Sequence, residues 1–567
     1  MCGVAGVLGP EAHEIVSGLL GKMSHRGPDG AGAVRGEGVS VGAVRLAMRG
    51  DPRQRPPNAF ADLVVAYNGE IYRSGIDDSN PPKNADDEIL AILEASGRRQ
   101  DADGMFAVVM MPLRDQALCV RRDRLGIKPL YYLRRDDTQA VASEAEALAL
   151  QFGVHLDNHG LAQTMLLGRA IGGRTLYRGV REIVGGGGVR ISSSGRQCVV
   201  NERSSPVLSA DLSEQLRLSL VATLQGCAFT SRKLGLAVSG GLDSTILAHE
   251  LNRLGVEDLT TFSVIAQDGG DGVESLAELG MPSNGAWTRW RHVVVRVNAN
   301  DFLQITRESV VAMGQPHRLT SAPLTVALAR AVAAEEVVAL LSGEGPDELF
   351  FGYAGHVDLA AALSYAERVS ARRRLLADYV FSRRMTQALT QQSAQRVWSA
   401  LEEHLGKVAA LTDAQALMRL ELDFSLAPLL QRNDHIFMRH SVEVRVPFLH
   451  GDCLAIAEAD AAAQPLSTLV GKARLRDAWR NVLRPELVAR EKTPFRAPFA
   501  VWTKRNAFRQ SCIATILEAT GTTVFRDAGL APPTAQELME IDASSLFAWV
   551  TTATWIMHRQ ATYYSNP

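Results

Sequence analysis

The chain has 567 residues, of which 46% are hydrophobic and 22% are charged, and its formal net charge is -2. This composition is typical of a folded globular protein and excludes an extensively disordered chain. At roughly 100 to 200 residues per domain, the length predicts two or three domains. A net charge near zero gives no general attraction to nucleic acids or anionic membranes, so we expect neither as a partner.

The sequence shows no signal for secretion or membrane insertion. Its first residues, MCGVAGVLGPEAHEIV, have neither a basic start nor a long apolar core, and no run approaches about 18 apolar residues. The six cysteines are dispersed, without a C-x-x-C pair, which argues against a structural zinc site or a disulfide framework. We therefore predict a cytoplasmic protein.

The predicted elements divide the chain into two parts. Up to about residue 200, short strand-like runs such as DLVVAYNGEIY and GMFAVVMMP are separated by Gly, Asp and Pro turns. This pattern indicates stacked antiparallel sheets in an α+β fold. The stretch NERSSPVLSADLSEQ then lacks periodicity, and we place the domain boundary there, which gives domains of residues 2–205 and 206–567.

Strands that alternate with helices begin the second part. The apolar run LGLAV leads into the loop SGGLDS and a helical segment, LTTFSVIA forms another strand, and VVALL precedes a second Gly-rich loop, SGEGPDE. This alternation predicts a parallel α/β sheet with ligands at the carboxyl ends of its strands. From about residue 355 onward the pattern is mostly helical.

Cys2 is a candidate nucleophile. If Met1 is removed, the thiol lies beside a free α-amino group, which titrates near pH 8 and can accept the thiol proton. The alternative interpretation of this residue on its own is a small buried hydrophobic side chain.

Six motifs follow Cys2 in a fixed order. They are SHRGPDG (24–30), VRL (44–46), YNGEIY (67–72), ADDEIL (85–90), DGMFAVV (103–109) and RDRLGIKPLYY (122–132). Together they resemble the class II, N-terminal-nucleophile glutamine amidotransferases, in particular the glutaminase domain of the asparagine synthetases. The resemblance implies an antiparallel αββα sandwich over nearly all of this part.

Hydrolysis of a glutamine amide needs a thiol, donors for the oxyanion, and charges that hold the two α-groups of glutamine. The resemblance implies that Cys2 is the thiol. It implies further that the side-chain amide of Asn68 and the backbone N–H of Gly69 form the oxyanion hole. The implied partners of the glutamine carboxylate and ammonium groups are, respectively, Arg45 and the pair Glu70 and Asp86.

The SGGLDS loop lacks the Gly-Lys-Ser/Thr ending of a P-loop, so it suits kinase-type chemistry poorly. It resembles instead the pyrophosphate-binding loop of the ATP pyrophosphatase superfamily, which has an adenine nucleotide hydrolase-like fold. With SGEGPDELFFGY and HSVEVRVPFLH, it resembles the synthetase domain of the asparagine synthetases. The implied ATP contacts are Ser239, Gly240, Gly241, Asp243 and Ser244 at the phosphates, and Leu236, Val264 and Gly343 at adenosine.

Loss of pyrophosphate from ATP needs counter-charge, which Mg²⁺ usually supplies. Asp243 and Asp347, each at the end of a predicted strand, are the candidate metal ligands. The resemblance implies that Glu344 acts on ammonia or on the tetrahedral intermediate, and that Lys472 holds the α-phosphate of an acyl-adenylate. Lys492 is a weaker basic candidate.

Taken together, these residues predict a glutamine-hydrolysing, ATP-dependent amidotransferase of the asparagine synthetase type. Ammonia released by Cys2 would pass through an internal channel and capture an acyl-adenylate, giving a carboxamide, AMP and pyrophosphate. Aspartate is the leading acceptor, and the sequence leaves a homodimer open.

Several acceptor-facing positions depart from the pattern of the family. They are Pro346, Phe351, His435, Phe437 and His450, and Gly30, after RGPD in the glutaminase half, is a further departure. Three alternatives therefore stay open: amidation of another small or natural-product carboxylate, an intramolecular amide ligase like the β-lactam synthetases or lasso-peptide cyclases, and a non-enzymatic nucleotide-binding regulator. The intact Cys2 and Asn68–Gly69 pair argue against the intramolecular ligase, and the retained Glu344 and Lys472 argue against the regulator.

Overall fold

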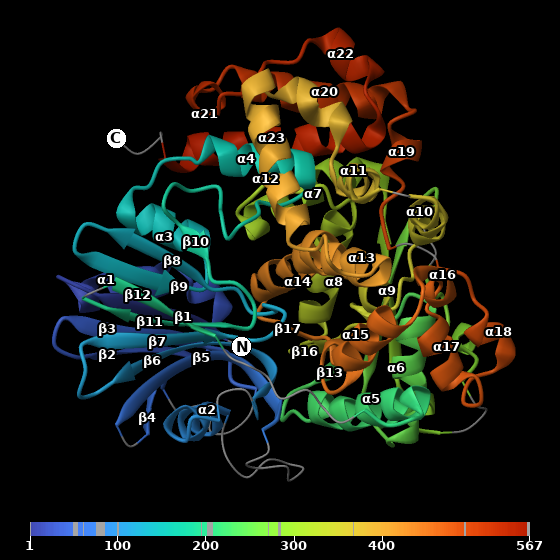
Figure 1. Ribbon diagram of the computed structural model, residues 1–567, viewed down its shortest axis with the longest axis horizontal. Coiled ribbons are helices and arrows are strands. Elements are labelled where there is room, and N and C mark those ends of the chain that lie inside the picture. Colours follow the sequence, from blue (N-terminus) through green and yellow to red (C-terminus); the bar gives the residue numbers. More distant parts are fainter. Residues whose placement is uncertain are drawn as a thin grey trace.

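The structure is a computed structural model (Figure 1). It describes residues 2–48, 55–60, 62–74, 86–98, 101–193, 195–200, 208–269, 272–281, 285–366, 368–492 and 495–563. The predicted domain boundary at residues 205 and 206 lies outside the described residues.

Two stacked antiparallel sheets form the N-terminal half. The first has the order β10-β8-β9-β1-β3-β2 and the second β12-β11-β7-β6-β5-β4. The strands are β1 (Cys2–Leu8), β2 (Gly30–Arg35), β3 (Val39–Arg45), β4 (Asn58–Phe60), β5 (Leu63–Arg73), β6 (Asp103–Pro112), β7 (Ala117–Arg122), β8 (Tyr131–Arg135), β9 (Thr138–Ala142), β10 (Arg181–Glu182), β11 (Gly187–Ser192) and β12 (Gly195–Val200).

Helices cover the outer faces of both sheets. Helices α1 (Ala12–Lys22) and α3 (Ala145–Phe152) pack on the first sheet, and α2 (Asp86–Ala95) packs on the second. The sheets approach closely because Gly6 has no side chain, since a Cβ there would lie 2.6 Å from Val109 Cγ1. The αββα sandwich predicted for this half is confirmed.

A parallel sheet forms the centre of the C-terminal half. Its order is β15-β14-β13-β16-β17, and every neighbouring pair is parallel. The strands are β13 (Leu234–Ala237), β14 (Thr260–Ala266), β15 (Arg291–Val297), β16 (Ala339–Leu341) and β17 (Glu443–Arg445). Strands β13, β14 and β16 coincide with the predicted apolar runs, whereas β15 and β17 were not predicted; the parallel α/β prediction is confirmed.

Helices flank this sheet and form most of the remaining chain. Helix α5 (Leu212–Ala228) precedes β13. The helices between the strands are α6 (Leu242–Arg253), α7 (Ala299–Met313), α8 (Ser321–Ala334), α9 (Pro346–Leu349), α10 (Ala354–Ser364), α11 (Val369–Val380), α12 (Gln391–Gly406), α13 (Asp413–Glu421) and α14 (Ala427–Met438). After β17 follow α15 (Cys453–Ala463), α16 (Leu466–Leu469), α17 (Ala473–Trp479), α18 (Pro485–Val488), α19 (Phe499–Trp502), α20 (Asn506–Thr520), α21 (Thr523–Asp527), α22 (Ala535–Glu540) and α23 (Ala543–Tyr563).

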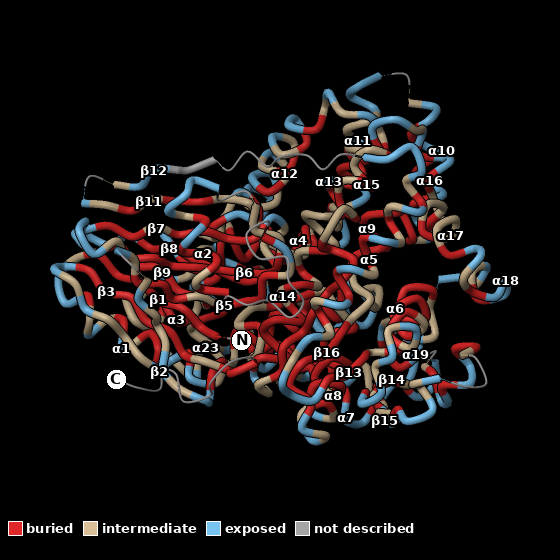
Figure 2. The backbone as a smooth tube through the Cα atoms, turned by 90° about the horizontal axis from the view of Figure 1, so that it is seen from below, coloured by how far each residue is buried: buried red, intermediate tan, exposed pale blue. Residues whose placement is uncertain are grey.

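The two halves share a buried boundary. Buried strands of both halves converge on α14 in Figure 2, and one cluster of apolar side chains contains residues of both. Helix α4 (Asn158–Leu167) of the N-terminal half packs on α12 of the C-terminal half. Among the described helices, none combines the length and apolar character needed to cross a membrane.

Candidate active sites

Cys2 is the first residue of β1 and lies opposite Arg45 of β3. The residue is buried, and its backbone N–H donates a hydrogen bond to Asn68 Oδ1 at 3.0 Å. Burial raises the pKa of the Cys2 thiol, while the backbone N–H of Leu46 and the Arg45 guanidinium act in the opposite direction. Since the thiolate is the reactive form, this thiol needs a base at the moment of attack.

Asn68 and Gly69 lie in β5, next to Cys2. The Nδ2 atom of Asn68 is buried and, in the described part of the chain, has no hydrogen-bond partner. Gly69 has φ +145°, and a Cβ there would lie 1.9 Å from the carbonyl oxygen of Met105. Only glycine fits this backbone. The unpaired Asn68 amide is a donor of the kind that an oxyanion hole requires.

The three residues predicted to hold the ends of glutamine differ in their partners. Asp86 begins α2, and its Oδ2 accepts hydrogen bonds from the Tyr67 hydroxyl and the Ile71 N–H, both at 3.3 Å. Glu70 is buried and forms an ion pair with Arg445 at 3.2 Å. Arg45 ends β3 opposite Cys2. The structure thus brings these charges to the end of β1, with Glu70 engaged by the other half of the molecule.

Tyr67 was not among the predicted site residues. Burial, and then the negative charges of Asp86 and Glu70, raise its pKa well above the usual value. Tyr67 therefore stays a neutral hydroxyl that can donate to Asp86. The signal was present, because Tyr67 begins the YNGEIY motif.

Charged side chains of β17 and α14 reach the N-terminal site from the C-terminal half. Arg445 Nε donates to Glu443 at 2.6 Å, and both residues are fully buried. Burial disfavours the Glu443 carboxylate, but Arg445 and Lys128 hold its pKa below the usual value. Asp434 of α14 pairs with Arg26 at 2.6 Å. Sequence reasoning missed the Arg26–Asp434 pair because its partners are 408 residues apart in the chain.

The SGGLDS loop connects β13 to α6, as predicted. Gly240 has φ +75°, and Gly241 caps the N-terminus of α6. A cavity at the carboxyl ends of β13, β14 and β16, which we call the nucleotide cavity after its predicted ligand, is lined by eight predicted residues: Ser239, Asp243, Ser244, Val264, Gly343, Glu344, Asp347 and Lys492. The predicted residues Gly240, Gly241 and Lys472 are not among its lining residues. Leu236 does not line this cavity, because its side chain is buried in β13. Its contact with adenosine stays a prediction.

Lys472 lies between the two predicted metal ligands. Its Nζ is 2.6 Å from Asp243 Oδ2 and 2.8 Å from Asp347 Oδ1, and Lys492 Nζ is 2.6 Å from Asp347 Oδ2. Burial raises the pKa of Asp243. Burial also acts to raise the pKa of Asp347, but the positive charges of Lys472 and Lys492 outweigh it and lower that pKa. Lys472 has φ +63°, a strained conformation for a residue with a side chain.

The positions of Asp243 and Asp347 also bear on whether this site suits Mg²⁺. Asp243 and Asp347 both contact one cationic atom, Lys472 Nζ. Mg²⁺ is usually held by one or two carboxylates together with nucleotide phosphates, so this donor set fits the ion if Lys472 moves toward a phosphate.

Glu344 lines the nucleotide cavity and forms an ion pair with Arg432 of α14. Arg432 is buried and also donates to Ser321 Oγ at 2.7 Å. Arg432 was not among the predicted site residues.

The residues that depart from the family pattern lie in different surroundings in the structure. Pro346 occupies the first turn of α9, where its missing N–H costs nothing. Phe351 is buried with φ +55°, and Phe437 lines the nucleotide cavity. His450 packs edge-on against Tyr72, with ring centroids 4.7 Å apart.

Comparisons with known proteins agree with this geometry. The family model for asparagine synthase matches residues 215–553, and the model for a glutamine amidotransferase domain matches residues 1–200. A Mycobacterium tuberculosis protein whose name includes asparagine synthetase (glutamine-hydrolyzing) is 26% identical over 91% of this chain and 90% of its own. Asparagine synthetase (glutamine-hydrolyzing) 1 of Bacillus subtilis is 22% identical over 89% of this chain and 88% of its own.

Among solved structures, the allosteric regulatory enzyme of purine biosynthesis is 18% identical, covers 54% of this chain and 77% of its own, and has a TM-score of 0.28. The asparagine synthase model alone spans more than half of the chain. The chain therefore belongs to the asparagine synthase family.

Proposed function

We propose that the protein is a glutamine-hydrolysing, ATP-dependent amidotransferase that forms a carboxamide from a small carboxylate, with aspartate as the leading acceptor and asparagine as its product. One observation carries this proposal: β17 joins the two sites. Its Arg445 side chain pairs with Glu70 beside Cys2, and its backbone oxygen accepts the N–H of Ser342 at 2.9 Å. Ser342 starts the SGEGPDE loop that holds Glu344 and Asp347.

In the first half-reaction, the Cys2 sulfur attacks the side-chain carbonyl carbon of glutamine. The α-amino group exposed by removal of Met1 takes the thiol proton and returns it to the leaving nitrogen. Asn68 Nδ2 and the Gly69 N–H stabilise the oxyanion, a contribution of roughly 3–4 kcal/mol per donor. Ammonia leaves, and water then hydrolyses the thioester to glutamate.

In the second half-reaction, a carboxylate oxygen of the acceptor attacks the α-phosphorus of ATP, and pyrophosphate leaves. Ammonia then attacks the acyl carbon, and AMP leaves with the bonding electrons. Asp243 and Asp347 would hold Mg²⁺, which supplies counter-charge for the phosphates. Lys472, released from the two carboxylates, would neutralise the α-phosphate, and Glu344 would accept a proton from the incoming ammonia.

A second acceptor class has support from the cavity itself. Its two lining cations, Arg432 and Lys492, are both paired with carboxylates of the protein, Glu344 and Asp347. Phe437 and Phe495 line the same cavity. This lining favours an acceptor with less charge than aspartate, and we keep such a carboxylate as the alternative substrate.

A panel of carboxylates assayed for AMP formation, with glutamine or ammonia as nitrogen donor, tests both acceptors. We expect Cys2→Ala to lose glutamine-dependent synthesis and keep ammonia-dependent synthesis, and Asn68→Ala to slow the glutamine reaction about 100-fold or more. Glutamine-dependent synthesis by Cys2→Ala at the wild-type rate would refute the first half-reaction. If no carboxylate yielded AMP with either donor, the second would be refuted.

A further inference from the structure

A second cavity lies between the two halves of the molecule and shares no lining residue with the nucleotide cavity. Its volume is about 560 Å³, which is within the range of about 300–1,000 Å³ that is usual for small-molecule sites. Loops of the N-terminal half at residues 122–131, 169–173 and 182–185 form one wall. The end of α12, the helix α13 and the start of α14 form the other. We call this cavity the interdomain cleft.

Positive charge predominates in the interdomain cleft. Its carboxylates are Glu182 and Asp423, and its cations are Arg122, Arg124, Arg169, Lys407 and Arg419. Arg124 is paired with Glu458, which lies outside the lining, so at least two positive charges remain in excess. This excess favours an anionic ligand, because a cleft with low-dielectric walls concentrates the electric field of the charges that line it.

Both carboxylates of the cleft already accept hydrogen bonds from two neighbouring side chains. Glu182 accepts from Arg122 at 2.8 Å and from Arg169 at 2.9 Å. Asp423 accepts from His404 and from Arg419, both at 3.1 Å. Lys407, exposed at the end of α12, has no ion-pair partner within the described chain. An anion could therefore bind Lys407 without displacing a protein carboxylate.

The helical wall of the cleft is irregular. Between α13 and α14 the chain forms a π-helical turn over Leu422–Leu426, and Arg169 donates to the carbonyl oxygen of Asp423 in this turn at 3.0 Å. Turns of this kind are rare in helices and are frequent at functional sites.

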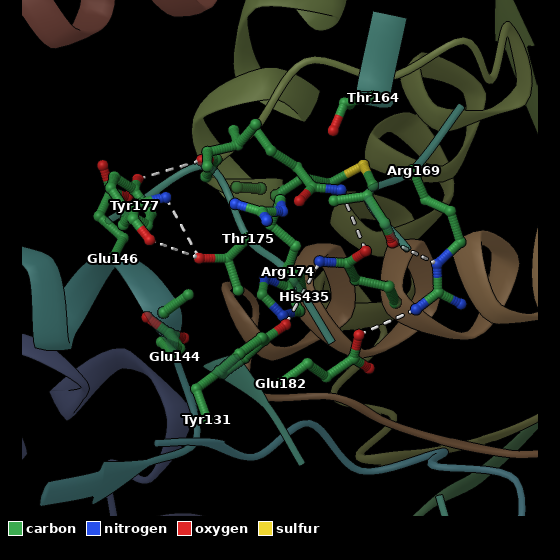
Figure 3. A pocket seen from close by; sticks show the side chains of 18 of the residues that line it. Tyr131, Glu144, Glu146, Thr164, Arg169, Arg174, Thr175, Tyr177, Glu182 and His435 are labelled. Atoms are coloured by element: carbon green, nitrogen blue, oxygen red, sulfur yellow. Dashed lines mark hydrogen bonds and ion pairs between the residues drawn. The ribbon is translucent and has the colours of Figure 1, made fainter. Parts of the chain in front are cut away.

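A smaller cavity of about 50 Å³ adjoins the cleft, and Figure 3 shows the side chains that line it; we call it the inner cavity. The two cavities share Tyr131, Arg169, Glu182 and Gln431. His435 lines the inner cavity and is 7% exposed, and its Nε2 has no hydrogen-bond partner among the described residues. Because buried polar atoms are nearly always hydrogen-bonded, this ring nitrogen indicates that a polar ligand group or water enters here.

We propose that the interdomain cleft binds an anionic small molecule with two or more carboxylate or phosphate groups, and that Lys407 and Arg419 make its principal charge contacts. The inner cavity beside His435 takes a polar group of the same ligand. This site is separate from the glutamine and ATP sites and does not depend on the proposed function.

Isothermal titration calorimetry with citrate and with inorganic phosphate, at constant ionic strength with chloride as the reference anion, tests the proposal and separates the two anionic chemistries. We expect at least one probe to bind. In the double variant Lys407→Ala/Arg419→Ala, the affinity for that probe should fall tenfold or more. Lys504→Ala removes an exposed lysine that does not line the cleft, and it should bind the probe like the wild type.

Two further measurements complete the test. Lys407→Glu reverses one exposed charge and should abolish binding, with the melting temperature showing that the variant is folded. A non-hydrolysable ATP analogue bound beforehand should leave probe binding unchanged. Absence of binding by both probes, unchanged affinity in the double variant, or competition with the ATP analogue would each overturn the proposal.

Discussion

At the scale of single residues, Lys472 neutralises the two carboxylates of the proposed nucleotide site while no nucleotide is bound. Its ammonium is the only group that contacts both Asp243 and Asp347 among the described residues. Lys472→Met keeps the volume but leaves Asp243 buried without this cation. Removing one partner of a buried ion pair typically costs about 3–5 kcal/mol. We expect a clearly lower melting temperature in EDTA.

The same variant should gain stability from metal ions. With the ammonium gone, Asp243 and Asp347 form an anionic pair that Mn²⁺ can occupy without nucleotide, so Mn²⁺ should raise the melting temperature of Lys472→Met more than that of the wild type. Lys492→Met, which removes a contact with Asp347 alone, is the matched control, and its melting temperature in EDTA should fall less. Equal melting temperatures of Lys472→Met and the wild type would contradict this account.

Single residues also mark the limit of sequence reasoning. Cys2, Asn68 and Gly69 could be proposed because short motifs surround them. Arg445 lies in an equally clear motif, HSVEVRVPFLH, but its partner Glu70 belongs to the other half of the chain. Pattern and spacing carry no information about which buried charges meet across a domain boundary, so only the packed structure reveals this pair.

At the scale of elements, short-range patterns were sufficient for the parallel sheet. Apolar runs followed by Gly-rich loops predicted β13, β14 and β16, and the structure confirms them. The strand order was not predictable, since β17 lies about one hundred residues after β16 in the sequence and yet pairs with it. The αββα sandwich followed from the family resemblance, because alternating strands alone do not specify how two sheets stack.

The strand β17 is expected to be more sensitive than its length of three residues suggests. Arg445→Met removes the guanidinium shared by Glu443 and Glu70, which are both buried, so the loss should again be about 3 kcal/mol or more in urea unfolding. Arg296→Met on β15 of the same sheet breaks an exposed pair with Glu274 and should leave the unfolding midpoint nearly unchanged. Similar midpoints for the two variants would refute the role given to Arg445.

At the scale of the whole molecule, two of the ion pairs that join the halves lie in different surroundings. Arg26 and Asp434 are both buried, 2.6 Å apart, and Arg26 also donates to the Cys2 carbonyl oxygen at 3.3 Å. Arg124 and Glu458 form the second pair at 2.6 Å, with side chains 36% and 44% exposed. Of these two, the Arg26–Asp434 pair borders Cys2, and we expect it to lie along the path of ammonia between the proposed sites.

Asp434→Asn should therefore uncouple the two half-reactions. The neutral amide weakens the contact with Arg26, and water that enters the boundary protonates ammonia, which can then no longer attack the acyl-adenylate. The wild type should form about one glutamate per AMP, since each released ammonia is used. We expect more glutamate than AMP from Asp434→Asn and a restored AMP rate with added ammonia. Glu458→Gln breaks the exposed pair and should keep the wild-type ratio; an unchanged ratio in Asp434→Asn would mean that this boundary does not confine ammonia.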